Sequence, residues 1–328
     1  MKVHPINDHI FALHADIRSD DLFEGIWPIP YGVSLNCYLV RGEKIALIDL
    51  VRDWVGAPTE LKNQLSSLGV SLEDVDYIIL NHLEPDHTGW LREFLSINKK
   101  AIVLTTAKGA ELVKNFYFER DRVRAIKEGD ILDLGLGQAL QFFETPNVHW
   151  PETMMTWAKE GGVLFSCDGF GSYGALGDRI FDDEISEDEH EFFEAESLRY
   201  YANIVASFGI FVKRAIEKLS SLPIRVIAPS HGIIWRANPN KIIERYLHYA
   251  NYSEGPREKE IAIIWGSMYG NTELGLKHVI EGIEEEKVPY SIHRVPNENV
   301  SFILADAYKS EGILIAMPTY EYKMFPPM

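Results

Sequence analysis

Short apolar segments that end in ionisable side chains limit the folds open to this chain more than any other feature of the sequence. His82 follows the apolar run Tyr77–Leu80, and Asp168 follows Val163–Cys167. Apolar runs of this length are typical of strands that are buried on both faces of a sheet. In α/β folds, ligands bind at the carboxyl ends of such strands. The sequence therefore predicts an α/β fold with a site where several strands end.

The first 250 residues alternate short strand patterns with helix patterns and are expected to form one domain, residues 1–250. Strands are expected at Ile10–Ala15, Ser34–Leu39, Ile45–Leu50, Tyr77–Asn81, Ile102–Thr105, Gln141–Glu144, Met154–Trp157, Val163–Ser166 and Arg225–Ala228, and helices at Thr59–Leu68, Gly89–Leu95, Lys108–Phe116, Glu187–Leu219 with a break near Gly209, and Asn240–Ala250. The acidic run Asp182–Glu191 is interpreted as a solvated helix start, because carboxylates suit the positive end of the helix dipole. A docking patch for a basic partner is the alternative.

A polar segment with a Gly-Pro pair, residues 251–258, is expected to be a linker to a second domain, residues 259–328. The second domain has a β-α-β-α-β pattern, which indicates a parallel sheet with right-handed crossovers. Its strands are expected at Ile261–Trp265, Ser291–Val295 and Ile313–Ala316, and its helices at Thr272–Glu285 and Phe302–Ser310.

The composition narrows the class of protein. The chain has 328 residues, a formal net charge of −17 and two cysteines. The negative charge argues against nucleic acid or an anionic membrane as a partner, since both are polyanions. There is no apolar run long enough to span a bilayer and no secretory leader pattern, and two cysteines cannot form a disulfide framework. We therefore expect a cytoplasmic location.

The segment His82-Leu83-Glu84-Pro85-Asp86-His87 places four metal-capable side chains within six residues. Buried carboxylates need partners, so a polar loop with an accidental cluster is the less favoured interpretation. Three more such residues follow strands further along: His149, Asp168 and His231. Together they are enough ligands for two metal ions. Cys167 is expected to point away from the site into the core, because neighbours in a strand alternate faces.

This ligand set resembles the metallo-β-lactamase superfamily, whose αββα sandwich binds two metals with an H-x-H-x-D-H loop and a later His, Asp and His. Glu84 departs from that pattern, because it replaces the second His of the loop. Zinc favours imidazole and thiolate ligands, whereas carboxylate-rich sites with imidazole suit non-haem iron. The charges agree: two ferrous ions would be balanced by Glu84, Asp86 and Asp168 together with a bridging hydroxide.

H-x-E-x-D-H followed by His, Asp and His is similar to the diiron pattern of the flavodiiron proteins, also called A-type flavoproteins. The segments around Phe23-Glu24-Gly25, Trp150–Met154 and Tyr200–Ile204 also resemble this family, although the His that some members carry near Glu24 is missing here. Carried over by position, the resemblance implies that one iron is bound by His82, Glu84 and His149, the other by Asp86, His87 and His231, and that Asp168 bridges them.

The resemblance further implies an oxidoreductase that reduces dioxygen to water or nitric oxide to nitrous oxide, with electrons that pass from an external donor through FMN to the irons. Rubredoxin, a reduced deazaflavin or a reductase are the donors that the resemblance allows. It also implies a head-to-tail homodimer, in which each flavin lies over the irons of the partner. The alternatives are a zinc-dependent hydrolase on the same fold and an electron carrier or binding module with a vestigial metal site.

A second site is expected at the strand-to-helix turn of the C-terminal domain. The turn lacks both nucleotide-binding glycine patterns but resembles the flavodoxin loop for FMN phosphate, and a later Pro-Thr-Tyr turn resembles the one beside the flavin ring. A simple helix cap and an ordinary proline turn are the alternatives. The expected FMN-binding residues are Ser267, Met268, Tyr269, Gly270, Asn271 and Thr272 in the first turn, and Pro318, Thr319, Tyr320 and Glu321 in the second. A flavodoxin-like sheet has five strands, so this domain is expected to be incomplete and the chain to be a fragment, with a degenerate member of the family as the alternative.

Overall fold

The first sheet of the computed structural model, which describes residues 3–328, has seven strands in the order β1-β2-β5-β6-β7-β8-β9. The strands β6 to β9 run parallel to one another, whereas β2, β5 and β6 pair antiparallel. The bounds are β1 His4–Pro5, β2 Ile10–Ile17, β5 Val33–Arg41, β6 Ile45–Ile48, β7 Tyr77–Ile79, β8 Ile102–Thr105 and β9 Val123–Ala125.

The second sheet has five strands in the order β10-β11-β12-β13-β14. Its inner face packs on the inner face of the first sheet, where Ile48, Phe142 and Phe165 belong to one buried cluster. The two sheets thus enclose a shared apolar core, as in other face-to-face sheet packings. The bounds are β10 Ile131–Gly135, β11 Gln138–Glu144, β12 Met154–Ala158, β13 Val163–Cys167 and β14 Val226–Pro229.

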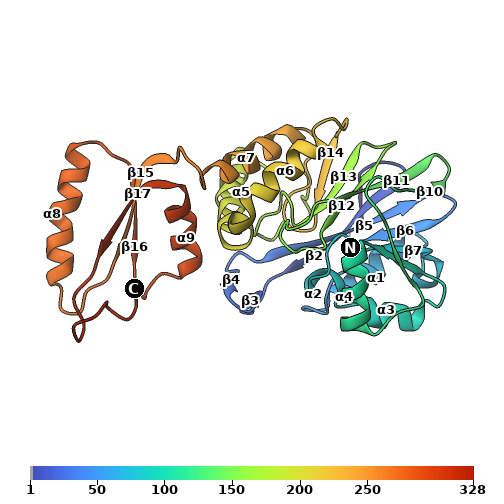
Figure 1. Cartoon of the computed structure of the whole chain (residues 1–328), viewed down its shortest axis with the longest axis horizontal. Helices are drawn as coiled ribbons and strands as arrows, with labels where there is room; N and C mark the ends of the chain where they lie inside the picture. The colour runs from blue at the N-terminus through green and yellow to red at the C-terminus, as the bar shows by residue number, and fades with distance from the viewer. Residues whose placement is uncertain (1–2) are drawn as a thin grey trace.

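Helices cover the outer faces of both sheets, and this arrangement confirms the predicted αββα sandwich (Figure 1). Near the first sheet lie α1 Ala57–Ser67, the 3-10 turn Leu72–Asp74, α2 Pro85–Thr88, α3 Leu91–Ile97 and α4 Ala107–Tyr117, and near the second lie α5 Glu187–Tyr200, α6 Gly209–Leu219 and α7 Pro239–Asn251. A small hairpin, β3 Leu22–Phe23 and β4 Trp27–Pro28, stands apart from both sheets.

The C-terminal part forms a third, parallel sheet in the order β16-β15-β17, which agrees with the first strands of a flavodoxin-like fold. The bounds are β15 Glu258–Trp265, α8 Asn271–Glu285, β16 Tyr290–Arg294, α9 Val300–Lys309 and β17 Ser310–Ala316. In Figure 1 α8 lies at the outer side of this sheet, and α9 lies between the sheet and α5. Among residues 3–328 no helix is long and apolar enough to cross a membrane.

The structure differs from the sequence-based expectation at several elements. The break expected near Gly209 is present, since α6 begins there, but it is longer than expected and includes a π-helical turn, Tyr201–Val205, and a 3-10 turn, Ala206–Phe208. The strands β9 and β10 and the hairpin β3–β4 were not predicted. Only one residue of the edge strand β10 is buried, and the hairpin strands have two residues each, so neither carries a buried apolar run that a pattern could detect. The expected linker ends early, because β15 already begins at Glu258.

Candidate metal centre and phosphate loop

The segment that carries four of the predicted ligands is held in place by a buried aspartate. Asp49, at the end of β6, accepts hydrogen bonds from the backbone N–H and the side-chain amide of Asn81 at 2.8 and 3.1 Å. The N–H of Leu50 donates to the carbonyl of His87 at 2.9 Å. Pro85 then opens the short helix α2, where its missing N–H costs nothing. The ligand loop is therefore anchored at both of its ends.

The structure brings all of the predicted metal ligands together. They form two groups, and within each group the potential ligand atoms lie within 4.8 Å of one another. His149 reaches the site from the loop between β11 and β12, Asp168 from the end of β13 and His231 from the end of β14. The two groups are His82, Glu84, His149 and Asp168, and Asp86, His87 and His231.

Asp168 lies between the two groups. Its Oδ1 atom is 2.9 Å from His87 Nε2 and 3.4 Å from His231 Nε2. Its Oδ2 atom is 3.4 Å from His82 Nε2 and 3.3 Å from His149 Nε2. Each carboxylate oxygen therefore faces a different group, which is the geometry that a carboxylate shared by two cations requires.

Further residues fix the orientation of the imidazoles. His82 Nδ1 donates to Glu152 Oε1 at 2.8 Å, and the same oxygen accepts the N–H of Leu83 at 3.0 Å. His231 Nδ1 donates to the carbonyl of Ser34 at 2.8 Å. In both rings the Nε2 atom is left to face the centre, as in the carboxylate–histidine–metal arrangements of metalloproteins.

Two of these supporting residues, Asp49 and Glu152, were missed as functional residues in the sequence. Both are 1% exposed, and buried carboxylates are rarely found without a specific partner. Glu152 lies three positions after His149, in the Trp150–Met154 segment that the sequence analysis noted only as a resemblance. Its acidic side chain next to an apolar strand was the available signal.

The charges of the site are strongly coupled. Burial alone would lower the pKa of His149, but the carboxylates of Asp168 and Glu84, at 3.3 and 3.2 Å from its Nε2 atom, outweigh it and raise the pKa to about 9. Burial likewise opposes the charged form of His231, and Asp168 and Asp86 raise its pKa to about 10. For the Asp168 carboxyl, burial acts to raise the pKa, but His87 and the neighbouring imidazoles hold it well below its usual range. The anionic and imidazole groups therefore lie at a separation at which each changes the ionisation of the other.

Several polar atoms at this centre make no hydrogen bond within the described part of the chain. These atoms are Oδ1 and Oδ2 of Asp86, Oδ2 of Asp168 and Nε2 of His231. Buried polar atoms nearly always have a partner, so these atoms together form a set of donors suited to a cation. The set consists of carboxylate oxygens and imidazole nitrogens, which suits first-row transition metals such as iron.

The position of Cys167 corrects the sequence-based expectation. Its Sγ atom lies in a third group with ligand atoms of His87 and Asp168, instead of pointing away from the site. Simple alternation fails because the backbone of Cys167 has a φ of 50° and the pairing register shifts between Phe165 and Cys167. Burial raises the pKa of the thiol well above its usual value, and nearby Asp49 acts in the same direction, so the thiol stays protonated.

A cavity of about 130 Å³ opens onto the candidate metal centre. Glu24 lies at its mouth and accepts a hydrogen bond from Trp27 Nε1 at 3.1 Å. Burial and the nearby Glu84 carboxylate raise the pKa of Glu24 to about 7. Arg52 and Trp54 also line the cavity, so its lining combines charged and apolar side chains.

The two turns expected to bind FMN lie side by side in the third sheet. Trp265 at the end of β15 pairs with Ala316 at the end of β17, so Ser267–Thr272 and Pro318–Glu321 leave the same edge of the sheet. Ser267 Oγ accepts the N–H of Gly270 at 3.0 Å, and Gly270 has a φ of 87°, which glycine tolerates. Tyr269 is 90% exposed. The first turn precedes α8, where backbone N–H groups favour an anion.

Known proteins resemble this chain in both of its parts, the two-sheet sandwich and the C-terminal sheet. Residues 33–232 match the family described as ODP family beta lactamase. A curated relative, the anaerobic nitric oxide reductase flavorubredoxin of Vibrio vulnificus, is 34% identical over 99% of this chain, and the chain spans 65% of that relative's length.

Solved structures extend the likeness over the whole chain. A variant of the flavo di-iron protein of Thermotoga maritima is 30% identical, with a TM-score of 0.90, over 99% of this chain and 82% of that chain. The rubredoxin oxygen:oxidoreductase of Desulfovibrio gigas is 27% identical, with a TM-score of 0.90, over 99% of this chain and 80% of that chain. The resemblance inferred from the ligand pattern is confirmed, and the chain belongs to the flavodiiron protein family.

Proposed function

We propose that this chain is an oxidoreductase that reduces dioxygen to water or nitric oxide to nitrous oxide at a pair of iron ions. The observation that carries the proposal is the donor set, in which Glu84 supplies a carboxylate where a zinc hydrolase has an imidazole and Asp168 faces both ligand groups. The names of two relatives support it, since one is called a nitric oxide reductase and the other a rubredoxin oxygen:oxidoreductase.

The proposed ligands divide as the family pattern divides them. His82, Glu84 and His149 would hold one iron, Asp86, His87 and His231 would hold the other, and Asp168 would serve both. When bound, the iron pair supplies the electrons that the small diatomic substrate accepts. Three carboxylates offset three of the four positive charges of two ferrous ions, so the buried centre carries little net charge.

The protein's own residues shape the space around that centre. The ring of Phe23 lies edge-on to His231, with ring centroids 5.3 Å apart, and so closes one side of the site against water. Glu24, Arg52 and Trp54 line the mouth and leave an opening suited to a small molecule. Glu152 and Ser34 hold two imidazoles in the orientation that binds metal, as the hydrogen bonds above require.

We further propose that the third sheet binds FMN and that an external donor such as rubredoxin reduces it. The N–H groups and the hydroxyls of Ser267–Thr272 would hold the phosphate, and Pro318–Glu321 would lie beside the flavin ring. In Figure 1 this sheet lies to one side of the sandwich, with α9 between them. A head-to-tail homodimer, in which each flavin serves the partner's metal centre, would bring the two cofactors together.

The substitution Glu84→His tests the proposal, because it exchanges the distinguishing carboxylate for a neutral imidazole. Metal content is measured after purification, and turnover is measured anaerobically with a reduced viologen and either gas. We expect less iron, relatively more zinc and loss of gas reduction. Glu111→His on the exposed face of α4 is the control and should behave as the unmodified chain. Unchanged iron content and turnover in Glu84→His would contradict the proposal.

A further inference from the structure

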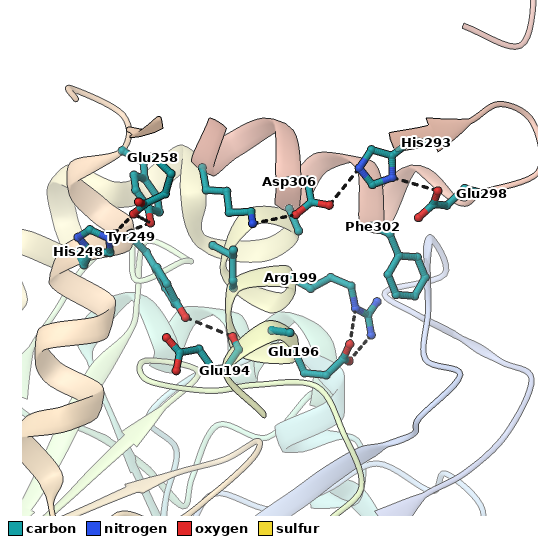
Figure 2. Close-up of a pocket in the computed structure, with 15 residues that line it drawn as sticks. Glu194, Glu196, Arg199, His248, Tyr249, Glu258, His293, Glu298, Phe302 and Asp306 are labelled. Carbon is teal, nitrogen blue, oxygen red and sulfur yellow. Dashed lines mark hydrogen bonds and ion pairs between the residues drawn. The ribbon is translucent and has the colours of Figure 1, made fainter. Parts of the chain in front are cut away.

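Arg199, near the end of α5, is a cation buried between the two parts of the chain. It is 2% exposed. Its guanidinium donates to both carboxylate oxygens of Glu196, from Nε at 3.0 Å and from Nη2 at 2.5 Å (Figure 2). A buried charge is tolerated only when it is paired and hydrogen-bonded, and this pair meets both conditions.

The remaining guanidinium nitrogen joins two segments that are far apart in the sequence. Arg199 Nη1 donates to the carbonyl of Pro28 in the hairpin strand β4 at 2.9 Å, and to Ser301 Oγ in α9 at 2.8 Å. Two rings enclose the same cation, since its central carbon lies 4.3 Å from the ring centroid of Tyr173 and 4.6 Å from that of Phe302. The side chain of Arg199 thus links the hairpin strand β4 to α9.

The hairpin that Arg199 holds is also the one that covers the candidate metal centre. Phe23 in β3 packs edge-on against His231, and Glu24 in the turn lies at the mouth of the cavity. Phe23 also lies 5.5 Å, between ring centroids, from the same Tyr173 that stacks on Arg199. The guanidinium therefore reaches the hairpin by two routes, through the carbonyl of Pro28 and through the Tyr173 ring.

We propose that Arg199 is a positioning residue that couples the docking of α9 to the placement of the hairpin over the metal centre. If α9 moves away from α5, Nη1 loses Ser301 and the Phe302 ring, and its hold on the Pro28 carbonyl weakens. The position of Glu24 at the cavity mouth then depends on how the flavin-binding part sits. The coupling rests on the proposed function only for what the centre binds, because every contact in it belongs to the chain itself.

A fork of several fixed N–H groups is needed for this role. Arginine can hold Glu196 with two nitrogens and still donate to Pro28 and Ser301 from the third, whereas lysine has one compact ammonium group. Asn203 in the π-helical turn adds a contact to α9, since its Nδ2 donates to the carbonyl of Ser301 at 3.1 Å. A second contact of this kind keeps α9 nearby when the hydroxyl of Ser301 is removed.

The test uses Ser301→Ala in the full chain, because this change lies outside the hairpin and leaves the Arg199–Glu196 pair intact. Amide hydrogen exchange of residues 22–28 and of α9 is followed by mass spectrometry. We expect both segments to exchange about fivefold faster, the factor that one net hydrogen bond is worth, while β7 and β8 stay unchanged. The fluorine resonance of 5-fluorotryptophan at Trp27, assigned with Trp27→Phe, should shift in the same variant.

Arg199→Lys should produce a larger effect of the same pattern. Arg245→Lys is the matched control, because Arg245 is also a nearly buried arginine that pairs with α5, through Glu194, but contacts neither the hairpin nor α9 among its described interactions. Faster exchange in α9 alone, or no change in the hairpin and in the Trp27 signal, would overturn the coupling. Neither measurement depends on bound iron, so a failed Glu84→His experiment leaves this result readable.

Discussion

The candidate metal centre and the phosphate loop are built in opposite ways. Six of the seven proposed metal ligands are buried, and loops after strands of both sheets bring them to one place. The loop Ser267–Thr272 is short, local in sequence and largely open, with Tyr269 90% exposed. The first site is held by contacts between distant parts of the fold, whereas the residues of the second are half-buried or exposed before a ligand binds.

The two sites therefore differ in how far their residues are held in place before a ligand binds. In the metal centre, hydrogen bonds from His82 to Glu152 and from His231 to the carbonyl of Ser34 set the ring orientations, so little rearrangement accompanies binding. In the phosphate loop a single internal hydrogen bond, from the N–H of Gly270 to Ser267, holds the turn among the described side-chain contacts. We therefore expect substitutions at the first site to have larger effects than substitutions at the second.

The largest effect is expected for Asp168→Asn, compared with Glu84→Gln. Asp168 faces both ligand groups, whereas Glu84 belongs to one. Asp168→Asn should therefore lose both metals together, with affinity reduced more than about 100-fold, the upper end seen for outer-shell changes. Glu84→Gln should retain more metal. Elemental analysis after dialysis measures this, and full retention of two ions in Asp168→Asn would place the bridge elsewhere.

A smaller loss is expected for Glu152→Gln, which tests whether preparation of the metal site matters. The amide keeps the size of the side chain but accepts the hydrogen bond of His82 less strongly. Metal affinity should fall about 10–100-fold, with little change in the melting temperature of the metal-free chain. Competition with a chelator measures the affinity, and the exposed Glu160→Gln serves as control. Equal affinity in both variants would mean that His82 needs no support.

Ser267→Ala tests the open site alone. It removes a hydroxyl that accepts the N–H of Gly270 and that is free to donate to a phosphate. FMN affinity should fall about tenfold, the sum of one or two net hydrogen bonds, and metal content should not change. Quenching of flavin fluorescence on titration gives the affinity, with Ser96→Ala on α3 as control. A change in metal content would show that the two regions are not independent.

The smallest effect is expected from a titratable pair in the C-terminal part. The ion pair with Asp306 raises the pKa of His293, burial opposes this, and Glu298 adds to the rise, with both carboxylates 3.0 Å away (Figure 2). A raised pKa in the folded state stabilises the fold below the unfolded value of about 6.5, and the benefit disappears as the pH rises through the folded value.

His293→Gln should therefore lower the free energy of unfolding at acidic pH by at most about 1 kcal/mol, since solvent weakens such pairs, and should have no effect in alkaline solution. Denaturant unfolding at several pH values measures the difference. A constant difference at all pH values would indicate lost packing instead of a lost charge interaction.

The sequence predicted which ionisable side chains the fold brings together, because their signal is chemical. Ligand types such as His82 and Asp168 stand out at the ends of apolar strands, and the strand ends of a sandwich meet in one region. Residues that act through another residue carried no such signal. Glu152 is a single acid in an otherwise ordinary segment, and Arg199 lies in a helix rich in charged side chains, so their roles depend on contacts across the fold.

The fold was predicted where the periodicity is strong. Strands such as β8 and β13 were placed within a residue of their observed ends, because their apolar runs are continuous. Exposed edges such as β10 and the hairpin β3–β4 were missed, because pairing with a neighbour, and not their own pattern, creates them. The direction of Cys167 was wrong because its positive φ interrupts the alternation of the strand.

One proposed ligand group joins the two sheets, with His87 in the segment after β7 of the first sheet and His231 after β14 of the second. An ion bound by these ligands would crosslink the two sheets of the sandwich. A ligand that binds only the folded state at 100 times its dissociation constant adds about 2.7 kcal/mol to the free energy of unfolding. The supply of iron in the cell would then set how long each copy survives proteolysis, in addition to how fast it works.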